Sequence, residues 1–89
     1  MDNRYYKLKR ILEQNKEWPL AYMFKFIVPN KEGKVEKVIG IFPEDAQKSF
    51  KYTDSLKYVS ITCVLEMNNA EEIITITEAA MAVPGVIML

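Results

Sequence analysis

Few residues in this chain of 89 have side chains suited to catalysis. The sequence contains no His and a single Cys, Cys63. One copy of the chain therefore cannot assemble a zinc site of the usual Cys and His type, a disulfide or a Ser-His-Asp relay. We expect no metal, no cofactor and no enzyme activity, and we interpret Cys63 as a small apolar residue of the core.

One short segment has the residue types that bind an anion. Asn30, Lys31, Gly33 and Lys34 form a turn-like stretch before a predicted helix, where backbone donors and two ammonium groups favour negative charge. These four residues are the predicted ligand-binding loop for a small molecule. The alternative is an ordinary turn, in which Gly33 serves the backbone and both lysines are solvated.

The charge balance bears on the choice of partner. Twelve Lys and Arg balance twelve Asp and Glu, so no overall field attracts a polyanion and nucleic acid is not the expected partner. Residues 1–37 hold nine basic and five acidic residues, whereas residues 38–89 hold three and seven. This segregation fits either solvated faces or complementarity between copies or with a partner.

The sequence also bears on localisation. The first ten residues, MDNRYYKLKR, are charged where a secretory signal needs an apolar stretch. No run approaches the roughly 20 apolar residues of a membrane span. We expect a cytoplasmic protein with a reduced thiol and no membrane partner.

Alternation of apolar and polar residues predicts two central strands. Leu20–Val28 is rich in aromatic and β-branched residues, and one of its faces includes Lys25, which resists burial. Lys57–Glu66 alternates in the same way. The residues expected on the core side are Tyr22, Phe24, Phe26, Val28, Val59, Ile61, Cys63 and Leu65.

The remaining segments complete the element order. Helical spacing predicts a short helix at residues 2–14 with Asp2 as its cap, a second from Val35 to Phe42, and a third that starts at Asn69. Residues 46–53 and 86–89 are predicted strands at the sheet edges. We expect Trp18 to pack at the edge of the core.

This order, a helix followed by β-α-β-β-α-β, predicts an α+β ferredoxin-like two-layer sandwich. Its sheet has four antiparallel strands with helices on one face. Right-handed crossovers place the fourth strand beside the first, followed by the third and second. We divide the chain into an N-terminal helical extension, residues 1–17, and one domain, residues 18–89.

The sheet face away from the helices is the second candidate surface. If the alternation holds, that face is mixed and polar, and its predicted contact residues are Lys25, Lys51, Tyr58, Ser60 and Thr62. They suit a partner protein or, as the alternative, single-stranded RNA, with Tyr58 and Lys25 on the bases and Lys51 on a phosphate.

Which face of the first central strand is buried decides whether RNA binding is favoured. RNA-reading domains of this topology stack bases on aromatic residues of both central strands. Tyr58 is the single aromatic residue expected on that face, which favours a solvated surface. The opposite phase would expose Phe24 and Phe26 as a stacking platform and would favour RNA.

Two other classes of protein with this topology can be tested on the residues. An acyl-phosphate hydrolase needs an Arg in the loop after the first strand, whereas Arg4 and Arg10 precede that strand. A copper carrier needs two thiolates in that loop, whereas Cys63 lies alone in a strand. The exposed sheet edges invite pairing, so we expect a homodimer.

Several strings of residues resemble one bacterial family. They are Trp18-Pro19, Phe24-Lys25-Phe26-Ile27, Tyr58-Val59-Ser60-Ile61-Thr62, Ala70-Glu71-Glu72-Ile73 and Pro84-Gly85-Val86-Ile87-Met88-Leu89. In this order they resemble the YbeD-like proteins, a domain of unknown function similar in fold to ACT-type regulatory domains. The resemblance implies a stand-alone, non-enzymatic module that senses a small metabolite or contacts another protein, with a link of some members to lipoate metabolism. Leu56 stands where members often have Gly, which puts the turn conformation there in question.

Overall fold

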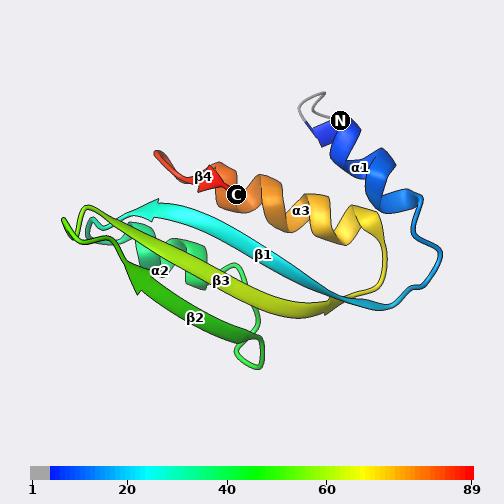
Figure 1. Ribbon diagram of the computed structural model, residues 1–89, viewed down its shortest axis with the longest axis horizontal. Coiled ribbons are helices and arrows are strands. Elements are labelled where there is room, and N and C mark those ends of the chain that lie inside the picture. Colours follow the sequence, from blue (N-terminus) through cyan, green and yellow to red (C-terminus); the bar gives the residue numbers. More distant parts are fainter. Residues whose placement is uncertain (1–4) are drawn as a thin grey trace.

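Two long antiparallel strands form the centre of the computed structural model, which describes residues 5–89 (Figure 1). The elements are α1 (Tyr6–Glu13), β1 (Leu20–Pro29), α2 (Lys34–Ile39), β2 (Gln47–Tyr52), β3 (Tyr58–Met67), α3 (Ala70–Met81) and β4 (Ile87–Met88). The sheet order is β2-β3-β1-β4, and every neighbouring pair is antiparallel. This confirms the predicted α+β ferredoxin-like fold.

The central strands β1 and β3 pair along their whole length of ten residues each. The register runs from Leu20 opposite Met67 to Pro29 opposite Tyr58. Since side chains alternate between faces along a strand, this register puts every second residue of both strands on the same side of the sheet.

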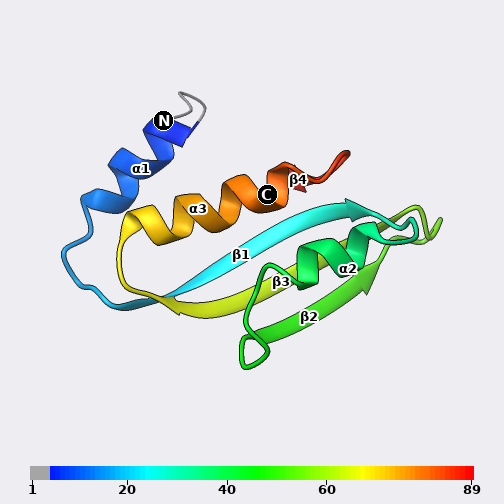
Figure 2. The same ribbon diagram turned by 180° about the vertical axis from the view of Figure 1, so that it is seen from behind.

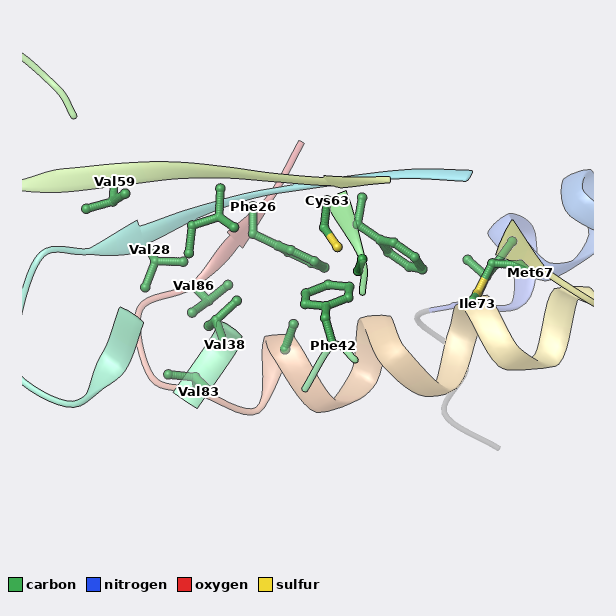
Figure 3. Packing of buried hydrophobic residues seen from close by; sticks show 14 residues of the cluster. Phe26, Val28, Val38, Phe42, Val59, Cys63, Met67, Ile73, Val83 and Val86 are labelled. Carbon is green, nitrogen blue, oxygen red and sulfur yellow. The ribbon is translucent and has the colours of Figure 1, made fainter. Parts of the chain in front are cut away.

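The buried side of the central strands is the one that the alternation predicts. Phe24 and Phe26 are 2% and 1% exposed, and Ile61 is 1% exposed. Figure 3 shows Phe26 and Cys63 pointing from the sheet toward α3, with Phe42 between the two layers. The Phe42 ring lies 5.3 Å from the Phe24 ring, centroid to centroid. Cys63 is fully buried, and burial raises the pKa of its thiol.

Helix α3 begins where its predicted cap stands. The Asn69 side chain accepts a hydrogen bond of 2.9 Å from the Glu72 backbone N–H. The Glu72 carboxylate in turn accepts one of 2.9 Å from the Asn68 backbone N–H, so two groups at the helix start are satisfied. The buried face of α3 carries Ile73 and Thr77, whose hydroxyl donates to the Ile73 carbonyl at 2.8 Å.

The N-terminal helix α1 packs against α3 (Figure 1). Its Lys9 forms an ion pair of 3.1 Å with Glu71 of α3. Trp18 follows it, half-buried against the core, and its indole N–H donates to the Asn15 carbonyl at 2.8 Å. The cap expected from Asp2 lies outside the described residues. The division of the chain at residue 17 stays a prediction.

Among the elements shorter than the sequence predicts are α2, β4 and β2, which spans Gln47–Tyr52 instead of residues 46–53. Helix α2 ends at Ile39 instead of continuing to Phe42, because Gly40 disfavours a further helical turn. Strand β4 is only two residues long, Ile87–Met88, instead of the four residues 86–89. No helix within residues 5–89 is long and apolar enough to cross a membrane.

Candidate functional site

Three connections meet at one end of the molecule. The connection from β1 to α2 lies beside the β2-β3 hairpin in both views (Figures 1 and 2), and hydrogen bonds link them. The Asn30 backbone N–H donates to the Lys57 carbonyl at 2.9 Å, and the Asn30 side-chain amide donates to the Leu56 carbonyl at 2.8 Å. The third connection, between α3 and β4, joins them through Lys34, whose ammonium group donates to the Pro84 carbonyl at 2.8 Å.

These connections border an open cleft of about 550 Å³, which we call the lysine cleft. Its lining residues are Pro29, Asn30, Lys31, Lys34, Leu56, Lys57, Tyr58 and Gly85. The lining includes three lysines and, among the described residues, no carboxylate. Three ammonium groups around one cleft of this size favour a small anion.

The predicted ligand loop contributes most of its members to this cleft. Asn30, Lys31 and Lys34 line it, whereas Gly33 is not among the lining residues. Gly33 is the N-cap of α2, with a φ of 85° in the left-handed region that glycine adopts without strain. Helix α2 has six residues, so the positive charge of the cleft comes from lysine side chains rather than from a helix dipole.

Sequence reasoning missed the contribution of the β2-β3 hairpin. Leu56, Lys57 and Tyr58 line the cleft together with the predicted loop. The signal was present in the predicted strand order, since pairing of β1 with β3 puts the end of β1 beside the start of β3. The register has Pro29 opposite Tyr58, which brings the two connections together.

Leu56 has an unusual backbone conformation for its residue type. Its φ is 60°, in the left-handed region, which costs a residue with a Cβ roughly 1–2 kcal/mol. The Leu56 backbone N–H donates to the Thr53 carbonyl at 2.9 Å, closing the turn. The hairpin therefore keeps a conformation that suits glycine, although Leu occupies the position.

Gly85 closes the cleft on the side of β4. Its φ is 86°, and a Cβ at this position would lie 2.7 Å from Cγ of Pro29. The backbone of the α3-β4 connection can approach β1 this closely only because Gly85 has no side chain.

The predicted contact residues of the open sheet face do share one side of the sheet. The register puts Lys25 opposite Thr62, and Ser60 opposite Lys51. Both lysines and Tyr58 are exposed, whereas Ser60 and Thr62 are half-buried. Apolar residues border this polar centre: exposed Met23, half-buried Ile27 and exposed Ile87.

The edge strand β2 exposes two aromatic residues on the opposite side of the sheet. Phe50 is opposite Ile61 and Tyr52 is opposite Val59, so both belong to the side that the helices cover. Phe50 is nevertheless 47% exposed and Tyr52 56% exposed. The short helix α2 leaves this edge uncovered.

Residues 13–89 match a protein family described as a protein of unknown function, DUF493. The chain belongs to this family. The match covers the whole sheet, α2, α3 and the lysine cleft, whereas α1 is covered only at Glu13. The YbeD-like resemblance is consistent with it. No curated protein and no solved structure matches the chain significantly.

Proposed function

We propose that this DUF493 protein is a non-enzymatic regulatory module that senses a small anionic metabolite in the lysine cleft. One observation carries the proposal: three lysines and no carboxylate line a cleft of about 550 Å³ in the described part of the chain. Clefts of this volume are of the size that small molecules occupy.

The hydrogen bonds between the connections around the cleft favour a preformed binding site. Asn30 is bonded to the hairpin through both its backbone and its side chain, and Lys34 is bonded to the Pro84 carbonyl. Groups that are already held lose little conformational freedom on binding, so more of the interaction energy becomes affinity.

Through the same hydrogen bonds, ligand binding in the cleft would be coupled to the surrounding elements of the fold. A bound anion would hold α2, the hairpin and the α3-β4 connection in one arrangement. Strand β4, which begins two residues after Gly85, is a sheet edge of two residues. Ligand binding would thus stabilise an edge at which a partner protein or a second copy can pair, and this coupling is the proposed sensing step.

The test uses inorganic pyrophosphate and citrate as probes in isothermal titration calorimetry. We expect both to bind the wild-type chain, and the double variant Lys31→Gln/Lys57→Gln to bind at least tenfold more weakly. Lys7→Gln/Lys16→Gln is the matched control, because it also removes two charges, from exposed positions in α1 and in the connection between α1 and β1. Absence of binding to the wild type, or equal loss in the control, contradicts the proposal.

The alternative function, single-stranded RNA binding, is supported by the exposed Lys25, Lys51 and Tyr58 on the open face. The burial of Phe24 and Phe26 removes the stacking platform that would favour it. Phosphate contacts are strongest at low salt, so absence of oligonucleotide binding at about 50 mM salt dismisses this alternative.

A further inference from the structure

The β2-β3 hairpin contributes two exposed apolar side chains to the lysine cleft, one on each side of Lys57 in the sequence. Leu56 is 62% exposed and Tyr58 41% exposed, and both line the cleft. Leu56 is not among the side chains packed against the core. Its backbone lies at a φ of 60°, where glycine would be unstrained. Neither core packing nor the turn therefore accounts for a leucine here, and its side chain is available to a ligand.

The lysine cleft also has ammonium groups that can bind an anion. Within residues 5–89, the ammonium groups of Lys31 and Lys57 have no hydrogen-bond or ion-pair partner. The Lys34 ammonium group uses one of its donors on the Pro84 carbonyl. Ammonium groups are compact charges with three donors each, which suits a phosphate group with several oxygens.

The shape of the cleft decides which apolar group accompanies the anion. The cleft lies at the surface between three connections, with Tyr58 and Leu56 at its exposed side. A flexible acyl chain gains most from an enclosed apolar tunnel, because at an exposed wall much of its surface would stay in water. A flat ring can lie on an exposed tyrosine and bury one face.

We infer that the lysine cleft binds a phosphorylated ring compound, with its phosphate at Lys31 and Lys57 and its ring against Leu56 and Tyr58. This inference rests on the proposed function and narrows its ligand class. Mononucleotides are suitable probes, since every base has a π face and stacking on an aromatic side chain tolerates different bases.

The experiment compares three probes by calorimetry: AMP, inorganic phosphate and adenosine. We expect AMP to bind about tenfold more tightly than inorganic phosphate, since one stacked base contributes about that factor. Adenosine should bind more weakly than AMP, because it lacks the charged group.

Two variants separate the ring contact from the phosphate contact. Leu56→Gly removes the side chain at a backbone conformation that glycine adopts readily, and the Leu56 carbonyl that Asn30 uses is retained. Tyr58→Thr removes the aromatic ring and keeps a residue that favours strands. Each variant should weaken AMP about three- to tenfold and leave the affinity for inorganic phosphate and pyrophosphate unchanged. A melting temperature close to that of the wild type confirms that each variant folds.

The outcomes distinguish this inference from the proposed function. If AMP binds no more tightly than inorganic phosphate, or if both variants weaken AMP and phosphate equally, the ring inference is wrong. Pyrophosphate binding that depends on Lys31 and Lys57 would still support the anion cleft in that case. If no anion binds the wild type, the proposed function fails and the ring inference fails with it.

Discussion

The two ends of the molecule each have a hollow of similar size but of opposite charge. The lysine cleft, about 550 Å³, has three lysines in its lining. The hollow at the other end, about 510 Å³, is lined by Glu13 and Glu71 and, among the described residues, by no lysine. Volume therefore does not distinguish the two ends, and charge does.

The charges at the two ends also differ in what they already bind. At the acidic end, Glu71 pairs with Lys9 and the neighbouring Glu72 carboxylate accepts from Asn68 at the start of α3, whereas Glu13 has no such partner within residues 5–89. At the lysine cleft, Lys31 and Lys57 have no such partner within residues 5–89. We infer that the acidic end serves the fold and that the lysine cleft serves a ligand.

The largest expected effect comes from filling the close contact at the lysine cleft. Gly85→Ala puts a Cβ 2.7 Å from Pro29 at a φ of 86°, and we expect it to lower the free energy of unfolding by about 2–4 kcal/mol. Urea denaturation measures this. Gly33→Ala is the matched control, because its φ is 85° but no atom lies within 4 Å of the added Cβ. The control should cost only about 1–2 kcal/mol, and equal losses would show that the close approach to Pro29 is unimportant.

A smaller effect is expected at the acidic end. Asn69→Ala removes the side chain that caps α3 and should lower the free energy of unfolding by about 1 kcal/mol. Asn69→Asp keeps an acceptor and should retain most of the stability. Thermal denaturation measures both variants. Because the comparison assigns anion binding to the lysine cleft, Asn69→Ala should leave the affinity for pyrophosphate unchanged. A weakened affinity would contradict the comparison.

The fold was predictable because its signals are local. Alternation in β1 and β3 identified their buried faces, and Asn69 with its acidic neighbours identified the start of α3. The predicted end of α2 was wrong. The helical spacing of Val35, Val38, Ile39 and Phe42 indicated a longer helix, and the effect of Gly40 was given too little importance. Phe42 is buried as that spacing indicates, but it reaches the core from a turn after the helix.

The candidate site was predictable only in part because it combines three connections that are distant in sequence. Lys31 and Lys34 were recognisable from their own segment. Lys57 gave no local signal, and it joins the cleft through the pairing of β1 with β3. The positive φ of Leu56 was indicated only by the Gly that members of the resembling family often have there, since the residue type itself argues against it.

The smallest stability effect is expected from the ion pair between the helices. Lys9→Gln breaks the contact with Glu71, whose side chain is 73% exposed, and exposed pairs contribute about 0–1 kcal/mol. We expect a change in melting temperature of no more than about 4 °C. A much larger change in melting temperature would contradict the comparison, because it would show that this charge pair contributes more stability than exposed pairs do.

The proposed homodimer would form through the exposed sheet edges, which lie between the lysine cleft and the acidic end. Strand β2 exposes Phe50 and Tyr52 at one edge, and β4 leaves most of β1 uncovered at the other. Sedimentation equilibrium at micromolar concentration should give twice the chain mass of 10.3 kDa. The mass of a single chain would contradict the dimer and would leave the lysine cleft unaffected.

The most direct measurement of the central claim is a titration of the ¹⁵N-labelled chain with pyrophosphate, followed by amide chemical shifts. The lysine cleft account predicts that the largest shifts fall in residues 29–34, 56–58 and 84–85. Largest shifts at Lys25 and Lys51 on the open face, or at Asn69 and its neighbours at the acidic end, would contradict it, as would a spectrum that pyrophosphate leaves unchanged.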